Sequence, residues 1–431
     1  MTKDNVKKVV SIDFDYWVPE DLVLDLGHQE NSLFITTLWN MRLSTYASLE
    51  TKLCISPDEI PQPLAMGKFF RDRKMQIKRS PSPIAIAESV PSIDKLMNLR
   101  HLWLRSKKPH AILRIRHELS QAIRDFFYAE GFINCDTPIL TPSACEGTTT
   151  LFEVPYFDIG TAYLTQSGQL YNEATMGAFG KVYCFGPVFR AEKSNTRKHL
   201  TEFWMVEPEM AYADLDDVMD LSDKFVSYLV SRVLERCGDD LKVLERDTAS
   251  LEKSAKGGFP RLHYADACDQ IIKKAAELKQ SSEAELQRLG EQAMKEPGGD
   301  LGAPDETILG MIYDTPVMVH RYPMAMKAFY MKPDPLAPEA ALCVDMIAPD
   351  GYGEIIGGGQ REDNAEKLQA KIDHEKLPME AFEWYLDVRR YGSVPHGGFG
   401  LGLERLVAWV SGAQHVRETI PFPRMLYRIY P

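Results

Sequence analysis

The chain has 431 residues, and its 50 Lys and Arg against 62 Asp and Glu give a formal net charge of −12 at pH 7. Hydrophobic residues make up 44% and charged residues 26%, which excludes disorder and coiled coil as descriptions of the whole chain. The length predicts two or three domains of roughly 150 residues each. Apolar runs are too short to span a membrane and the first residues lack the apolar core of a signal peptide, so we expect a cytoplasmic protein without membrane contact.

Seven cysteines lie far apart without a CxxC pair. This spacing argues against a disulfide framework and against a zinc site. The net negative charge argues against a protein whose whole surface is basic, but it does not exclude a local basic surface that binds nucleic acid.

The first 90 residues differ from the rest, because short strand-like runs alternate there with Pro-rich segments. We therefore expect a small β-rich domain over 1–90 and a second, larger domain over 91–431. Within the first domain, KFFRDRKMQIKR (68–79) carries six Lys or Arg and one acid. It is either the solvated face of an ordinary element or a contact to an RNA backbone.

Beyond residue 108 the pattern favours an α+β domain with an antiparallel sheet flanked by helices. Apolar residues at 112, 115, 119, 123 and 126 predict a helix that Gly131 ends. GFINCDTPIL then predicts a short strand. Further on we expect strands at 182–189, 203–210, 316–320, 326–331, 341–347 and 352–357, a charged helical stretch over 240–310, and helices at 215–236, 363–392 and 402–411.

The segment FRAEKSNTRKHLTEF (189–203) predicts a hairpin that concentrates basic side chains beside Glu192. Arg190 offers a planar fork to phosphate oxygens, and Phe203 is placed to stack on a base. The alternative is an exposed turn whose charges only keep the protein in solution, and the residues alone leave both interpretations open.

Two glycine-rich segments are further candidates. HGGFGLGLERLVAWV (396–410) predicts a turn into a helix, with Arg405 in the first turn, where a cation opposes the helix dipole unless an anion is near. In DGYGEIIGGGQRED (350–363), Glu354 with nearby Asp345 is suited to Mg²⁺ on phosphate oxygens. A plain strand-to-helix turn and a β-bulge with surface acids are the alternatives.

Together these segments resemble the class II aminoacyl-tRNA synthetases, in their aspartate/asparagine branch. GFINCDTPIL resembles motif 1, with Pro138 at its characteristic proline, FRAE followed by HLTEF resembles motif 2, and GFGLGLER resembles motif 3. The resemblance runs from about residue 93 to the C-terminus and implies the class II catalytic fold, ATP and Mg²⁺ as cofactors, and a homodimer. Residues 1–90 lack the family's OB-fold pattern, so they are either a strongly diverged anticodon-binding barrel or another domain.

The resemblance also implies roles at a nucleotide site, with Arg190 and Arg405 as the catalytic residues. It places Arg190 on the ATP α-phosphate, Glu192 beside the nucleotide, Phe203 on adenine, His199 and Arg405 near the γ-phosphate, and Glu354 on Mg²⁺ with Asp345 as a second metal ligand.

For the amino acid, the aspartate enzymes have a segment of type QSPQLYKQ, whereas this chain has QSGQLYNEA (166–174). Gln169, for the α-amino group, is retained, but Asn172 replaces the lysine that binds the aspartate carboxylate. The resemblance further places Glu207 on the carboxamide N–H, Arg361 on the carboxamide oxygen and Glu146 on the α-ammonium. It therefore implies asparagine rather than aspartate.

The expected activity is ATP-dependent activation of asparagine to an aminoacyl-adenylate, followed by transfer to tRNA. Because the anticodon-binding pattern is missing, we retain an alternative: a synthetase paralogue that passes the activated asparagine or aspartate acyl group to ammonia, a small amine or a protein.

Overall fold

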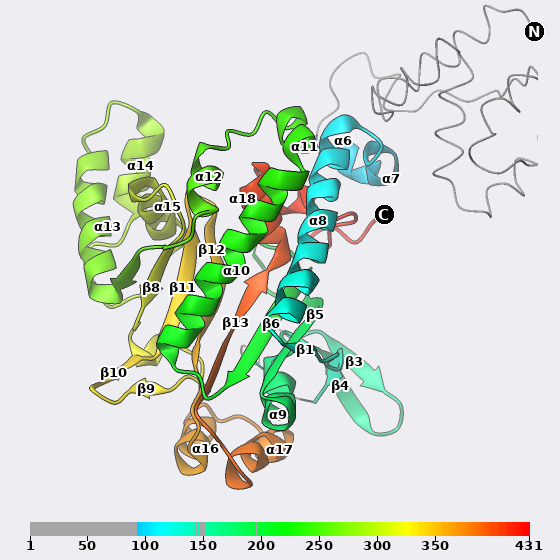
Figure 1. Cartoon of the computed structure of the whole chain (residues 1–431), viewed down its shortest axis with the longest axis vertical. Coiled ribbons are helices and arrows are strands. Elements are labelled where there is room, and N and C mark those ends of the chain that lie inside the picture. Colours follow the sequence, from blue (N-terminus) through cyan, green and yellow to red (C-terminus); the bar gives the residue numbers. More distant parts are fainter. Residues whose placement is uncertain (1–92, 143–144, 146–150, 195) are drawn as a thin grey trace, which may run out of the picture. The chain divides into compact units, whose positions relative to one another are not determined.

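The computed structural model describes residues 93–142, 145, 151–194 and 196–431 (Figure 1). The elements predicted in 1–90, the basic stretch 68–79 and Glu146 lie outside these residues. The described part begins with α6 (Ile93–Asn98) and α7 (Arg100–Trp103), which carry a small apolar cluster of Leu96, Met97 and Trp103. Within the described residues, no helix is both long and apolar enough to cross a membrane.

Residues 112–430 are built on an eight-stranded sheet. Neighbouring strands are antiparallel except for the two edge pairs, β1–β5 and β7–β8, which are parallel. The predicted α+β fold is thus confirmed. The strand order is β1 (Ile133–Asn134), β5 (Lys181–Phe189), β6 (Glu202–Ala211), β13 (His396–Gly402), β12 (Gly353–Gln360), β11 (Cys343–Ala348), β8 (Val317–His320) and β7 (Arg261–His263).

Two long helices, α8 (Lys107–Ala129) and α10 (Leu215–Arg236), run side by side across one face of this sheet (Figure 1). Their apolar residues pack against alternate strand positions, including Val206 and Val344. Because successive side chains of a strand point to opposite faces, the neighbouring Glu207, Cys343 and Asp345 point to the other face. The face opposite α8 and α10 therefore carries these polar side chains, beside a second apolar cluster that includes Val319 and Ile347.

Two further sheets and the shorter helices complete the unit. The small sheets are β2 (Leu140–Thr141), β4 (Gly160–Leu164) and β3 (Glu153–Tyr156), and the pair β9 (Pro333–Asp334) and β10 (Ala337–Ala341). The helices are α9 (Gln169–Phe179), α11 (Gly238–Val243), α12 (Ala249–Ser254), α13 (Tyr264–Leu278), α14 (Ala284–Gln292), α15 (Ala303–Ile312), α16 (Ala365–His374), α17 (Met379–Arg390) and α18 (Leu403–Ser411), with 3₁₀ turns η4 (Met324–Met326) and η5 (Val416–Glu418).

Two predicted elements differ from the structure. The segment 326–331 is not a strand, because η4 and a turn occupy it. The single helix expected over 363–392 is two helices, α16 and α17, separated before Pro378, since proline disfavours helical conformation in the residue that precedes it. The predicted hairpin is confirmed: β5 and β6 pair antiparallel from Phe189 opposite Glu202 onward.

Candidate active site

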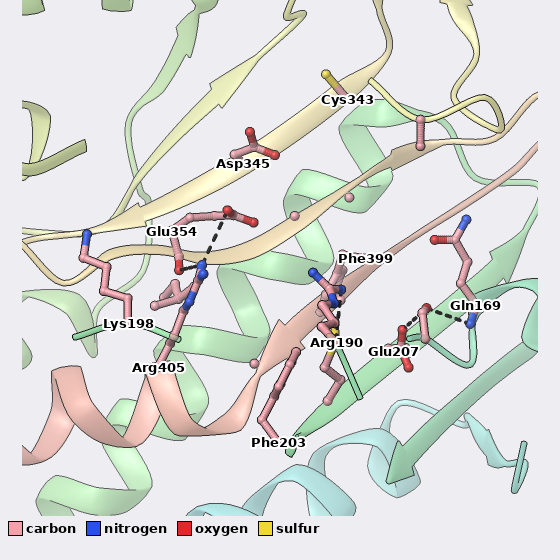
Figure 2. Close-up of a pocket in the computed structure, with 18 of the residues that line it drawn as sticks. Gln169, Arg190, Lys198, Phe203, Glu207, Cys343, Asp345, Glu354, Phe399 and Arg405 are labelled. Atoms are coloured by element: carbon pink, nitrogen blue, oxygen red, sulfur yellow. Dashed lines mark hydrogen bonds and ion pairs between the residues drawn. The ribbon is translucent and has the colours of Figure 1, made fainter. Parts of the chain in front are cut away.

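A cavity of about 320 Å³ lies on the polar face of the sheet. Its lining comes from the centre of the sheet, from η4 and from the start of α18. Figure 2 shows Lys198, Glu354 and Arg405 at one end, Gln169 and Glu207 at the other, and Arg190 and Phe203 between them. The hairpin, both glycine-rich segments and the QSGQLYNEA segment thus meet in one cavity, although they are far apart in the sequence.

Arg190 follows β5 and faces Phe203, at the start of β6. The guanidinium carbon lies 5.5 Å from the centroid of the Phe203 ring, and Nη2 lies 3.8 Å from Sδ of Met205. A guanidinium held against an aromatic ring and a thioether presents its planar edge to the cavity. This arrangement suits a ligand with a phosphate next to a flat ring.

Three more basic side chains, Lys198, His199 and Arg405, line the end of the cavity near Glu354. Lys198 Nζ donates to Oε2 of Glu306 at 3.0 Å. His199 Nε2 lies 3.9 Å from Oε2 of Glu192, and the pKa of His199 is lowered, first by burial and next by the positive charge of Arg405. His199 is therefore neutral near pH 7 unless an anion binds beside it.

Arg405 lies in the first turn of α18, as predicted, and contacts β12. Its Nη1 donates to the backbone oxygen of Glu354 at 2.9 Å and lies 3.5 Å from the Oε2 of the same residue. The strand thus fixes the arginine while the rest of its guanidinium lines the cavity.

The carboxylates of Asp345, on β11, and Glu354, on β12, converge over Gly357. A Cβ placed on Gly357 would lie 2.8 Å from Oε1 of Glu354 and 3.6 Å from Oδ1 of Asp345. Burial raises the pKa of each carboxyl, and the charge of Asp345 raises that of Glu354 further. Lys327 Nζ, 2.7 Å from Oδ2 of Asp345, opposes the shift.

This pair fits the resident cation that the resemblance implies. Two neighbouring carboxylates repel each other, and Mg²⁺ is commonly bound by one or two carboxylates together with phosphate oxygens and water. Among the residues that the structure describes, no group of three or more His, Cys, Asp or Glu side chains forms a metal site. A divalent ion here would therefore take Asp345 and Glu354 as protein ligands and complete its shell with a phosphate-bearing ligand.

At the opposite end, Glu207 is buried and its carboxylate is held by the turn that precedes α9. Oε2 accepts from the backbone N–H of Gly168 at 2.9 Å, and Oε1 accepts from the hydroxyl of Ser167. Burial raises the pKa of Glu207, although these donors oppose the shift. Gln169 lines the cavity beside it.

Asn172 lies behind Glu207 and does not line the cavity. Its Nδ2 donates to the backbone oxygen of Glu207 at 2.7 Å, and the side chain is completely buried. The position where the aspartate enzymes carry a lysine thus supplies no cation to the cavity. A carboxylate on the ligand would have Arg361 as its nearest predicted partner at this end.

Arg361, at the end of β12, is also buried and lines the cavity. Its Nε and Nη2 donate to Oε1 of Glu209 at 3.2 and 2.6 Å, while Nη1 contacts Sδ of Met331 at 3.8 Å. Glu209 thus fixes the guanidinium through Nε and Nη2. Nη1 lies on the edge that Glu209 does not contact.

The floor of the cavity is formed by the backbone of β12 and β13. A Cβ on Gly358 would lie 2.5 Å from the backbone oxygen of Gly398 and from Cβ of Phe399. Real Cβ atoms do not approach so closely, so residue 358 must be glycine for the strands to pair as they do. The glycines predicted to bring backbone close to a ligand therefore also allow two strands to meet.

The structure brings together all the described residues that the sequence pointed to, namely Arg190, Glu192, His199, Phe203, Arg405, Gln169, Glu207, Arg361, Glu354 and Asp345. Sequence reasoning missed Lys327, Ser167 and Glu306. Lys327 had a signal, since it is a single cation in the apolar run MAMKAFYM. Ser167 lies in the QSGQLYNEA segment, but nothing in the pattern distinguished it. Glu306 had no signal, because it reaches the site only through its contact with Lys198.

Residues 92–426 match the family model of class II tRNA synthetases (D, K and N). The chain is 56% identical over 339 residues to the asparagine–tRNA ligase of Roseiflexus castenholzii, which covers 79% of this chain and 74% of that protein. It is 58% identical over 340 residues to the asparagine–tRNA ligase of Sorangium cellulosum, covering 78% of this chain and 74% of that protein.

Solved structures agree with the sequence comparison. The crystal structure of asparaginyl-tRNA synthetase from Pyrococcus horikoshii complexed with asparaginyl-adenylate superposes with a TM-score of 0.75 at 44% identity, covering 82% of this chain and 77% of that one. The asparaginyl-tRNA synthetase of Entamoeba histolytica in complex with asparaginyl-adenylate gives a TM-score of 0.70 at 31% identity, covering 81% and 76%. The shared cavity motifs and these relatives lead to one conclusion, that the chain belongs to the class II tRNA synthetases for aspartate, lysine and asparagine.

Proposed function

We propose that the protein activates asparagine with ATP to form asparaginyl-adenylate and then transfers the asparaginyl group to tRNA. The observation that carries this proposal is the division of the cavity. His199 and Arg405 line one end and Arg190 lies between the ends, whereas the other end pairs the buried acceptor Glu207 with the buried donor Arg361. A carboxamide has both an N–H donor and an oxygen acceptor, so it matches this pair.

In the first step the asparagine carboxylate attacks the α-phosphorus of ATP. The bond from that phosphorus to the pyrophosphate oxygen breaks, and pyrophosphate leaves with the electron pair. Arg190 binds the α-phosphate and stabilises the charge that develops on it, while Phe203 stacks on adenine and fixes the nucleotide. His199 and Arg405 bind the γ-phosphate, and Glu192 lies beside the nucleotide.

Asp345 and Glu354 would hold Mg²⁺, which supplies neutralisation of phosphate charge when bound. Nζ of Lys327 lies 2.7 Å from Oδ2 of Asp345 and holds that carboxylate in place. These acids do no proton transfer in the proposal, because a carboxylate nucleophile carries no proton to remove.

At the amino-acid end, Gln169 accepts from the α-ammonium group, Glu207 accepts from the carboxamide N–H and Arg361 donates to the carboxamide oxygen. Glu146, outside the described residues, is proposed as a second partner of the α-ammonium. In the second step a terminal ribose hydroxyl of tRNA attacks the carbonyl carbon of the adenylate, and AMP leaves. Transfer to ammonia, a small amine or a protein is not favoured, since the relatives above are named as tRNA ligases.

We also propose a homodimer. Apolar side chains are exposed on the segment that resembles motif 1 and on the β3–β4 hairpin: Ile133, Ile139, Leu140, Phe157 and Ile159. Exposed apolar groups on this scale are typical of a protein–protein interface. The division into a domain over 1–90 and a catalytic domain over 91–431 stays a prediction.

Pyrophosphate exchange tests the activation step. With ATP present, asparagine should support exchange at least ~100-fold better than aspartate, because an aspartate carboxylate would face Glu207 and the cation at this end, Arg361, is already paired with Glu209. A preference for aspartate, or equal rates, would contradict the assignment. Charging of total tRNA with labelled asparagine tests the second step, and exchange without charging would point to another acyl acceptor.

A further inference from the structure

Glu173 is a buried carboxylate to which the proposed roles assign nothing. It lies in the second turn of α9 and is completely buried. Three side chains from other elements bind it. Tyr385, on α17, donates to both carboxylate oxygens at 2.8 Å, Arg389, on α17, donates to Oε2, and Nε2 of His396, on β13, lies 3.0 Å from Oε2.

This carboxylate carries its charge inside the protein. Burial opposes ionisation, but the positive charges of Arg389 and His396 more than offset it, and the pKa of Glu173 is lowered. An ion bound on three sides by charged and phenolic donors has a fixed position. Glu173 is therefore a rigid anion beside the amino-acid end of the cavity.

A fourth partner of Glu173 belongs to the cavity lining. Gln169 Nε2 donates to Oε1 of Glu173 at 3.0 Å, one helical turn away on α9. A carboxylate only accepts hydrogen bonds, so the group of Gln169 that faces it must be the NH₂. The carboxamide oxygen of Gln169 is then the atom left for a ligand.

We propose that Glu173 is a positioning residue: it fixes Gln169 with its oxygen toward the α-ammonium of the amino acid. The inference rests on the proposed function, because it names the asparagine ammonium as the group that Gln169 binds. Glu173 acts through Gln169, without touching the substrate.

The test is Glu173→Gln, measured by pyrophosphate exchange. A glutamine at 173 offers both a donor and an acceptor, so Gln169 can turn its NH₂ toward the ammonium. We expect KM for asparagine to rise about 10- to 100-fold, as for loss of a hydrogen bond to a charged group, while KM for ATP stays within about twofold. An unchanged asparagine KM would overturn the inference.

A second variant keeps the test valid if the uncompensated Arg389 prevents folding. Glu173→Gln combined with Arg389→Gln removes one charge of each sign and leaves both side chains similar in size. The asparagine KM should stay raised in this double variant, because Gln169 is still not fixed by a carboxylate. Recovery of the wild-type KM would show that Glu173 only balances Arg389, and would overturn the inference.

Asp305→Asn is the matched control, because it also replaces a buried carboxylate by an amide. Asp305 accepts from the backbone N–H groups of Met294 and Gly302 at 2.8 and 2.9 Å and does not line the cavity. This variant should lower the melting temperature and leave both KM values and the amino-acid preference unchanged. Wild-type protein that gives no asparagine-dependent exchange would refute the proposed function itself, which separates that failure from a failure of the inference.

Discussion

Nη2 of Arg361 lies 2.6 Å from Oε1 of Glu209, and both side chains are almost completely buried. Nε of Arg361 binds the same oxygen at 3.2 Å. One edge of the guanidinium is therefore fixed by the protein before any ligand enters, which leaves the edge with Nη1 to contact a ligand. Such preorganisation lowers the entropy lost when the ligand binds.

This pair makes protein stability depend on pH. Burial, opposed by Arg361 and assisted by Glu173, raises the pKa of Glu209 from 4.5 to about 7. The folded protein then binds more protons than the unfolded chain between these values, so the free energy of unfolding should fall as pH rises through this window. Urea denaturation at several pH values should show this slope in the wild type and a weaker slope in Glu209→Gln. The same slope in both proteins would contradict the assignment.

Replacing the guanidinium group of Arg190 should slow adenylate formation. In Arg190→Gln, we expect kcat for asparagine-dependent pyrophosphate exchange to fall about 100- to 1,000-fold, since a preorganised donor at the α-phosphate is lost. Arg390→Lys, which changes an arginine paired with Glu383 and Asp387 on α17, serves as the control and should keep wild-type rates. A loss of less than about tenfold in Arg190→Gln would rule out its proposed role.

ATP binding should take up a proton at His199. Burial and Arg405 lower the pKa of this imidazole, so it is neutral in the free protein near pH 7. A γ-phosphate beside it favours the charged form and raises the pKa, and binding should therefore strengthen as pH falls from about 8 to about 6. In His199→Asn the pH dependence of KM for ATP should be weaker than in the wild type. Identical pH profiles would show that His199 does not contact the phosphates.

The carboxylate pair should control the requirement for Mg²⁺. In Glu354→Gln the Mg²⁺ concentration that gives half-maximal exchange should rise about tenfold or more, because one of two protein ligands is neutralised. Chelation by EDTA should stop exchange in the wild type. Glu380→Gln, an exposed change in the first turn of α17, is the comparison and should need no more Mg²⁺ than the wild type. An unchanged requirement in Glu354→Gln would exclude this residue as a ligand.

The proposed dimer should depend on the β3–β4 hairpin, where Phe157 and Ile159 are 86% and 83% exposed. Charges introduced at an apolar interface carry a desolvation cost that association does not recover, so Phe157→Asp with Ile159→Asp should give a monomer by light scattering. Tyr427→Asp changes an equally exposed side chain near the C-terminus and should leave the mass unchanged. A wild-type protein that is monomeric at micromolar concentration would refute the dimer.

The phosphate-binding residues could be predicted from short segments of distinctive composition, whereas the residues of the amino-acid end came only from the resemblance to the class II synthetases. Arg190 and Phe203 follow from the hairpin pattern, and Arg405 follows from the glycine turn. Lys327 was missed because its segment was predicted as a strand, whereas η4 and a turn place it against Asp345. The position of Lys327 depends on its pairing with Asp345 on β11. The local sequence around Lys327 contains no information about that partner.

Helix α9 was not predicted either, although it carries Gln169 and Glu173. Buried polar residues interrupt its apolar pattern, and Gly177 lowers its helical propensity. Arg389 and His396, which satisfy Glu173, are more than 200 residues away in the chain. A carboxylate buried with distant partners looks, in the sequence alone, like one exposed to solvent.

The glycine floor limits how this cavity can change its preference. At Gly358 a side chain would force β12 and β13 apart, so the floor cannot change at this point without disturbing the pairing of the two strands. A change of substrate is therefore easier at residues whose side chains line the cavity, such as Glu207, Lys327 or Met331. Variation in the ligand is thus expected to follow variation in these surrounding side chains.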